Sequence, residues 1–149
     1  MWIPSRHQWS VEICNLLLYQ FLRQSLAKLR TTIEHCEACI GRFLRGFFDS
    51  EGSMSGRSLT VSNTRFVTLT LVKNLLERLG LSVTGPHLLS RGGRNVVIKG
   101  KVYKANRNQY SLRVRTISLS LFRELIGFSI ARKTDALDKG LSALLHSRA

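Results

Sequence analysis

Two carboxylates, Asp49 and Glu51, stand out against a strongly basic chain. The 149 residues include 23 Lys+Arg and 9 Asp+Glu, and the formal net charge is +14. No acidic residue lies between Arg78 and Arg123, a stretch that holds ten Lys and Arg residues. Both carboxylates fall near the end of an expected helix, where the helix dipole favours cations instead. Carboxylates in this setting could hold a divalent cation against a phosphate, and a solvated capping segment is the alternative.

The excess of positive charge indicates a polyanionic partner. Each neutralised phosphate releases a counterion and adds salt-sensitive affinity, so nucleic acid is favoured. A membrane surface is less favoured, because the basic stretch does not have the pattern of an amphipathic helix. A general basic RNA-binding protein is a further alternative. With 44% hydrophobic residues the chain can bury a core, and no apolar run is long enough to predict a membrane span.

The sequence His35-Cys36-x-x-Cys39 suggests a metal-ligand pattern. No second Cys or His pair follows at ligand spacing, so a structural Zn²⁺ would lack a fourth ligand unless a second chain supplied one. Packing of Cys36 and Cys39 on one helix face is therefore the favoured interpretation. Three cysteines predict no disulfide framework, and the N-terminus does not resemble a secretory signal. We therefore expect a cytoplasmic location, in a prokaryote or an organelle.

The elements that must position these residues follow from hydrophobic periodicity. Helical spacing predicts helices over residues 10–31, 33–48, 64–80 with Thr64 as N-cap, 118–130 and 135–145. Alternation predicts strands over 53–55 and 58–62, joined by a turn at Gly56-Arg57, and over 83–90, 96–104 and 110–116. This order predicts one α+β domain whose antiparallel sheet has an apolar face and a basic face.

A sheet face with alternating polar and cationic side chains suits a nucleic-acid groove. On the clearest strand, Ser111, Arg113 and Arg115 share the polar face. In the preceding segment, a common parity is expected for Lys99, Lys101 and Tyr103. The expected DNA contacts are Arg57, Ser58, Thr60, Ser62, Arg65, Arg91, Arg94, Lys99, Lys101, Tyr103, Lys104, Arg107, Asn108, Arg113 and Arg115.

Residues 44–52 resemble the LAGLIDADG motif of homing endonucleases and related maturases. In this segment Leu44, Gly46, Asp49 and Gly52 match the motif, and Arg45 replaces the usual small residue. The element order over roughly 33–145 is also similar. The resemblance implies an α+β, LAGLIDADG homing-endonuclease-like fold with an antiparallel DNA-binding sheet backed by helices. We expect this domain over residues 33–149, after an N-terminal helical extension over residues 1–32.

The single copy of the motif implies a homodimer on double-stranded DNA. The two motif helices would pack through Phe43, Gly46, Phe47 and Asp49. The implied activity is a site-specific double-strand break in a long pseudo-palindromic site, with short 3′ overhangs. The chain is similar to intron-encoded archaeal members. The alternative within the same fold is an RNA maturase that assists splicing without cutting DNA.

The resemblance also implies the roles of individual residues. Glu51 and the Glu51 of a second copy would bind Mg²⁺, with a backbone ligand from near Ser50. Asn63, at the end of the second strand, would order waters. Lys133 is preferred over Arg132 as the cation near the scissile phosphate. Asp49 is interpreted as a structural acceptor at the helix end.

Overall fold

The computed structural model describes residues 2–3, 8–9, 16, 20 and 23–146, and the chain divides into compact units over Met1–Ile33 and Glu34–Ala149. In the first unit, β1 (Trp2–Ile3) pairs antiparallel with β2 (Gln8–Trp9), and α2 spans Leu26–Ile33. Half of the helix predicted over 10–31 lies outside the described residues. In the other half, residues 23–25 are not helical and α2 begins only at Leu26, so the predicted helix is not continuous up to residue 31. The role of residues 1–32 as an extension stays a prediction.

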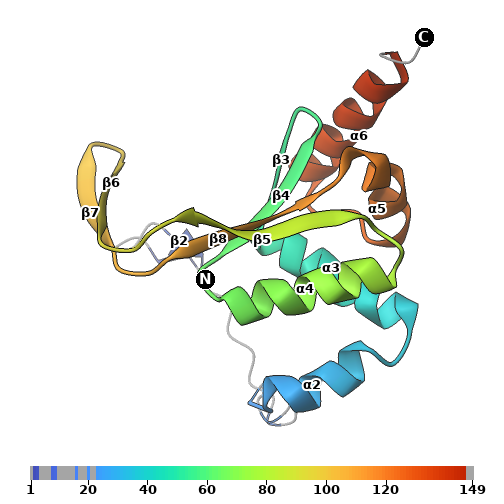
Figure 1. Ribbon diagram of the computed structural model, residues 1–149, viewed down its shortest axis with the longest axis horizontal. Coiled ribbons are helices and arrows are strands. Elements are labelled where there is room, and N and C mark those ends of the chain that lie inside the picture. Colours follow the sequence, from blue (N-terminus) through green and yellow to red (C-terminus); the bar gives the residue numbers. More distant parts are fainter. Residues whose placement is uncertain (1, 4–7, 10–15, 17–19, 21–22, 147–149) are drawn as a thin grey trace. The chain divides into compact units, whose positions relative to one another are not determined.

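The second unit is built on a four-stranded antiparallel sheet (Figure 1). Its strands are β3 (Gly52–Ser55), β4 (Ser58–Asn63), β5 (Val83–Ser90) and β8 (Gln109–Val114), in the order β3-β4-β8-β5. Between β5 and β8 the chain forms a separate hairpin of β6 (Arg94–Ile98) and β7 (Lys101–Ala105). The predicted strand over 83–90 and the hairpin turn at Gly56-Arg57 are confirmed.

Two helices, α3 (Glu37–Glu51) and α4 (Phe66–Arg78), lie on the same side of this sheet (Figure 1). The chain later passes through a 3-10 turn, η2 (Thr116–Ser118), into α5 (Leu119–Leu125) and α6 (Ala131–His146). Among the described residues, no helix is long and apolar enough to cross a bilayer.

The sheet has the two contrasting faces that the alternation predicts. Leu59, Val61, Leu112 and Val114 are at most 1% exposed. They form the core with buried side chains of α3, α4 and α5. The ring centroids of Phe48 and Phe122 lie 4.9 Å apart in an edge-to-face contact within this core. The α+β fold with one apolar sheet face is confirmed.

Several helix boundaries differ from the prediction for local reasons. The helix predicted over 33–48 begins at Glu37, because Cys36 is extended and its Sγ accepts a hydrogen bond from the Cys39 N–H. The N-cap of α4 is Arg65 and not Thr64. The helix predicted over 118–130 ends at Leu125, and Gly127 follows with a φ of 61° that glycine adopts without strain.

The last helix and the basic hairpin also differ from the prediction. The helix predicted over 135–145 begins earlier, at Ala131, so Arg132 and Lys133 lie in its first turn. The strand predicted over 96–104 is broken by a turn at Lys99-Gly100, with φ values of 49° and 76°. Lys99 is therefore in a turn and shares no strand face with Lys101 and Tyr103, which corrects their predicted common parity.

Candidate active site and nucleic-acid interface

Glu51 is the last residue of the motif helix α3 and is followed directly by β3. Its side chain is exposed. In the part of the chain that the structure describes, the Glu51 carboxylate makes no hydrogen bond or ion pair. A carboxylate held at a helix end without a protein partner keeps its oxygens available for an external cation.

Lys133 anchors this end of α3. Its Nζ donates to the carbonyl oxygens of Phe48, Asp49 and Gly52 at 3.0, 2.7 and 2.6 Å. Two of these belong to the last turn of α3, whose carbonyls generally lack intrahelical partners. An ammonium has three N–H donors, so all three are used on the backbone. The positive charge also offsets the negative pole of the helix dipole beside Glu51.

Asp49 fixes the same helix end through its side chain. The Ser129 backbone N–H donates to its two carboxylate oxygens at 3.1 and 3.2 Å, and the Ser129 hydroxyl donates to Oδ2. These bonds join α3 to the segment that precedes α6. Asp49 is thus an acceptor within its own chain, and its contact with a second copy stays a prediction.

Asn63 lies at the same end of the sheet as Glu51. The β3–β4 register pairs Gly52 with Val61, so the next positions of the antiparallel ladder run toward Ser50 on one strand and Asn63 on the other. The Asn63 Oδ1 accepts the Arg65 N–H at 2.8 Å, which shapes the turn into α4. Within the described residues its NH₂ group has no partner, so it is available to water.

The donors at the Glu51 junction are oxygen atoms, which Mg²⁺ prefers. They include the Glu51 carboxylate and the carbonyl of Ser50, a last-turn group that Lys133 does not contact. The Ser50 hydroxyl instead donates to the Phe47 carbonyl at 3.0 Å. One carboxylate per chain is few for a divalent cation, so the donor set fits Mg²⁺ best when a second copy supplies another.

The open face of the sheet brings several predicted contacts together. The register places Thr60 opposite Arg113 and Ser62 opposite Ser111. Arg113 is exposed, and a hollow of about 410 Å³ lies over these side chains. The sheet therefore presents hydroxyls and a guanidinium group on a concave surface. A second hollow, of about 370 Å³, brings together the predicted contacts Arg91 and Arg94.

Three polar residues of the larger concave surface were absent from the predicted contacts. Thr84, His87 and Ser111 also line the 410 Å³ hollow. Simple alternation along β5 could not find Thr84 and His87 together, because the register with β8 shifts between them. Gly85 lies at this irregularity, and a Cβ there would meet the Ser111 carbonyl oxygen at 2.7 Å.

Among the predicted contacts in the β6–β7 hairpin and at its base, some side chains are exposed and one makes a structural hydrogen bond. Asn108 is structural, because its Oδ1 accepts the Gly92 N–H at 2.9 Å and closes the base of the hairpin. Tyr103 and the cationic side chains of β7 are exposed. The other predicted contacts are exposed or half-buried positions on strands, turns and strand ends of the same unit: Arg57, Ser58, Arg65, Lys99, Lys101, Lys104, Arg107 and Arg115.

One face of α3 is not covered by its own unit. Gly46 is exposed, and a Cβ there would meet nothing within 4 Å. Phe43 and Phe47 flank it with stacked rings whose centroids lie 6.4 Å apart. The opposite face is closed, since a Cβ on Gly41 would lie 2.6 Å from the Leu125 carbonyl oxygen. Arg45, which departs from the motif, donates from Nε to the Ile126 carbonyl at 2.5 Å.

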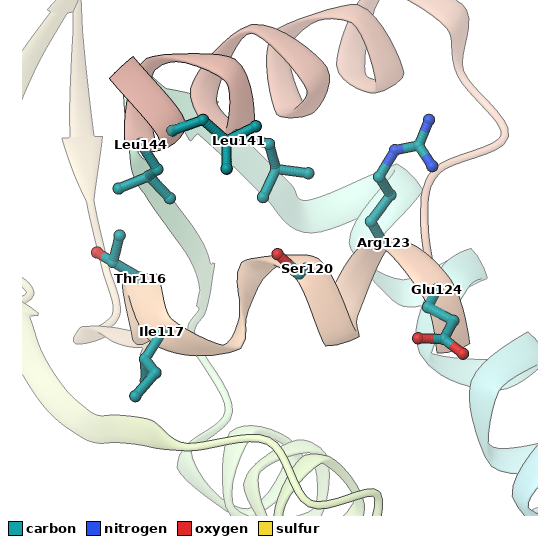
Figure 2. Close-up of a pocket in the computed structure, with 8 residues that line it drawn as sticks. Thr116, Ile117, Ser120, Arg123, Glu124, Leu141 and Leu144 are labelled. Atoms are coloured by element: carbon teal, nitrogen blue, oxygen red, sulfur yellow. The ribbon is translucent and has the colours of Figure 1, made fainter. Parts of the chain in front are cut away.

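A further hollow of about 690 Å³ lies between α6 and the η2–α5 segment (Figure 2). Leu141 and Leu144 lie across it from Thr116 (Figure 2). At its margin, Arg123 Nε donates to Asp138 Oδ1 at 2.5 Å, and this hydrogen bond holds the pKa of Asp138 below its usual value. None of the predicted site residues lines this hollow, so it is separate from the Glu51 junction.

We expect Lys133→Met to destabilise the protein by about 2 to 3 kcal/mol, because a charged donor to helix-end carbonyls is lost. Chemical denaturation measures this loss. Lys139→Met is the matched control: Lys139 is exposed on the same helix, and its substitution should change stability by less than about 0.5 kcal/mol. Equal midpoints for the two variants would contradict the anchoring role of Lys133.

Fold and site together define an α+β domain with a free helix-end carboxylate, a sheet with one polar and cationic face, and an uncovered helix face. A family model described as the LAGLIDADG-like domain matches residues 38–127, more than half of the chain. The chain belongs to this family, which includes homing endonucleases and maturases, and the resemblance seen in residues 44–52 is confirmed.

Two curated relatives are similar in sequence. An uncharacterized protein of Methanocaldococcus jannaschii is 32% identical over 139 residues, which cover 93% of this chain and 50% of that protein. A probable translation initiation factor IF-2 of Thermococcus kodakarensis is 33% identical over 102 residues, 68% of this chain and 8% of that protein. The chain thus spans half of the first relative and a small part of the second. No solved structure matches.

Proposed function

We propose that the protein is a site-specific, divalent-metal-dependent DNA endonuclease that acts as a homodimer. The observation that carries this proposal is the free Glu51 carboxylate at the end of the motif helix, in an otherwise basic domain. A protein that only bound nucleic acid would gain nothing from an unpaired negative charge at this point. Such a charge would repel phosphates unless a cation neutralised it.

The uncovered face of α3 supports the homodimer. A two-fold axis beside Gly46 would let two α3 helices approach closely, because neither carries a side chain there. Both Glu51 residues would then lie near the axis, one for each DNA strand. The stacked rings of Phe43 and Phe47 would gain burial in this arrangement.

The residues around Glu51 would divide the work of phosphodiester hydrolysis. Glu51 and the Ser50 carbonyl would hold Mg²⁺, and when bound the ion supplies Lewis-acid polarisation of the phosphate and activation of water. The Asn63 amide would orient water near the phosphate. Lys133 would keep the end of α3 in position, since its three donors are on backbone carbonyls. We therefore propose the exposed Arg132, rather than Lys133, as the phosphate contact.

The open sheet face would bind duplex DNA inside the cell. We expect Arg113→Ala to weaken specific binding by about 1 to 3 kcal/mol, the usual worth of a guanidinium contact to a base edge. Non-specific binding should change little. Lys73→Ala is the matched control, since Lys73 lies on α4 and pairs with Glu77 at 3.8 Å. Equal losses for the two variants, measured by fluorescence anisotropy at fixed salt, would contradict a direct role of Arg113.

Selection of cleaved duplexes from a random DNA library in Mg²⁺ tests the function itself. We expect discrete products with short 3′ overhangs from a pseudo-palindromic site, and none when EDTA removes the metal. A sequence that is bound specifically and never cut would refute the nuclease.

A maturase of the same fold is the second candidate. The observation that favours it is the exposed aromatic and aliphatic surface of the β6–β7 hairpin, where Tyr103 is 51% and Val102 65% exposed. Exposed aromatic rings can stack on unpaired RNA bases. Tighter binding of structured intron RNA than of duplex DNA at matched salt would favour this candidate over the nuclease.

A further inference from the structure

A cluster of potential metal ligands lies at the opposite end of α3 from Glu51. His35, Cys36 and Cys39 each offer one ligand atom, and these atoms lie within 4.8 Å of one another. The two sulfur atoms are 3.1 Å apart, and both thiols are free. The predicted placement of both cysteines on one helix face is wrong, because Cys36 precedes the helix as its N-cap.

The protein holds this cluster together without help from a ligand. Cys36 is extended, with φ −156° and ψ 164°, and its Sγ accepts the Cys39 N–H at 3.3 Å. Just before the cluster, Arg78 of α4 donates to the Glu34 carboxylate and to the Glu34 carbonyl, both at 3.3 Å. The residue next to His35 is therefore tied to the second unit, which limits how far the imidazole can move from the thiols.

The local electrostatics favour a thiolate. The hydrogen bond from the Cys39 side chain, followed by that from His35, lowers the pKa of Cys36 to about 7. The same shared hydrogen bond raises the pKa of Cys39. The positive end of the helix dipole also favours a negative charge at this point. The thiolate is the form of cysteine that binds metal.

We propose that His35, Cys36 and Cys39 bind one Zn²⁺ per chain, with the fourth coordination position open to water. Two thiolates and one imidazole are a known ligand set for zinc sites with three protein ligands. Bonds of about 2.3 Å in a tetrahedral site place two sulfurs about 3.8 Å apart, so the thiols need to separate by less than about 1 Å. Binding releases the two thiol protons to solvent and changes no oxidation state.

This site is independent of the proposed nuclease site. A helix of this length spans about 22 Å, so the cluster and Glu51 lie far apart. Their chemistry also differs, because thiolates select soft metals such as Zn²⁺ whereas the oxygen donors at Glu51 suit Mg²⁺. Zn²⁺ at the start of α3 would stabilise the folded chain, because the unfolded chain holds no preformed site.

Titration of the full, reduced and metal-free protein with Co²⁺ tests the proposal. We expect one ion per chain, with the visible absorption bands of tetrahedral cobalt and the charge-transfer band of a cobalt–thiolate bond, both removed by added Zn²⁺. Cys36→Ser and Cys39→Ser should each weaken binding by more than the roughly 10- to 100-fold typical of an outer-shell partner. Zn²⁺ should also raise the thermal midpoint of the unmodified protein, and Mg²⁺ should not reproduce this shift.

His87→Asn is the control and should leave the cobalt spectrum and its midpoint unchanged, because His87 is an exposed histidine on β5, outside the cluster. Binding that survives both Cys36→Ser and Cys39→Ser would overturn the proposal. One ion for every two chains would also overturn it, because the site would then be shared between copies.

Discussion

Glu51→Gln should abolish DNA cleavage and leave specific DNA binding nearly unchanged. The substitution keeps the shape of the side chain and removes the charge that would hold the cation. Metal-assisted stabilisation of the transition state is worth several kcal/mol, so we expect the rate to fall by roughly a thousandfold or more. Because Glu51 is exposed and has no partner among the described residues, the fold should tolerate the change. Single-turnover cleavage and equilibrium binding measure the two effects separately.

Glu124→Gln is the control for this experiment. It removes the same charge from an exposed position on α5, outside the predicted site. This variant should cut and bind DNA as the unmodified protein does, which excludes a general effect of net charge. If Glu51→Gln lost binding and cleavage in equal measure, Glu51 would be acting in DNA recognition or in folding rather than in catalysis.

Gly46→Trp should leave the monomer folded and dissociate the proposed dimer. A side chain at Gly46 has free space within its own chain, since an added Cβ meets nothing within 4 Å. In the dimer the same side chain would separate the two α3 helices. Overpacking costs about 1 to 3 kcal/mol per site, and two-fold symmetry places it twice in the interface, so we expect the dissociation constant to rise roughly a hundredfold or more. Analytical ultracentrifugation measures this change.

Gly41→Ala, on the same helix, should destabilise the folded monomer, whereas Gly46→Trp should destabilise only the dimer. Its added Cβ would lie 2.6 Å from the Leu125 carbonyl oxygen, inside the monomer. We expect a loss of about 1 to 3 kcal/mol in the stability of the monomer, measured by denaturation. A Gly46→Trp protein that still formed the dimer would show that the uncovered face of α3 is not the interface.

Much of the fold follows from short-range pattern in the sequence. Alternating residues in β4 and β8 place Leu59, Val61, Leu112 and Val114 in the core, because a strand turns successive side chains to opposite faces. The LAGLIDADG-like segment identified the family and the helix-end position of Glu51 without any coordinates. The strand over 83–90 was also predicted with its observed bounds.

The predictions from sequence that were wrong concern segments where a single residue sets the backbone conformation. Cys36 caps α3 with its sulfur, a use that hydrophobic spacing does not reveal. The Lys99-Gly100 turn divides a stretch that looks extended, because a two-residue turn leaves the alternation almost unbroken. The register shift in β5 places His87 beside Thr84 on the open face, and neither was among the predicted contacts.

The sequence by itself determined the family, the two-faced sheet and the carboxylate at the end of the motif helix, because motif spacing and period-two alternation are local properties. Only the tertiary structure decided what surrounds that carboxylate. Lys133 and Ser129 reach the end of α3 from about eighty residues away, and their hydrogen bonds leave Glu51 as the side chain without a protein partner there, within the described residues. Contacts across such separations depend on how whole elements pack, which no local pattern encodes.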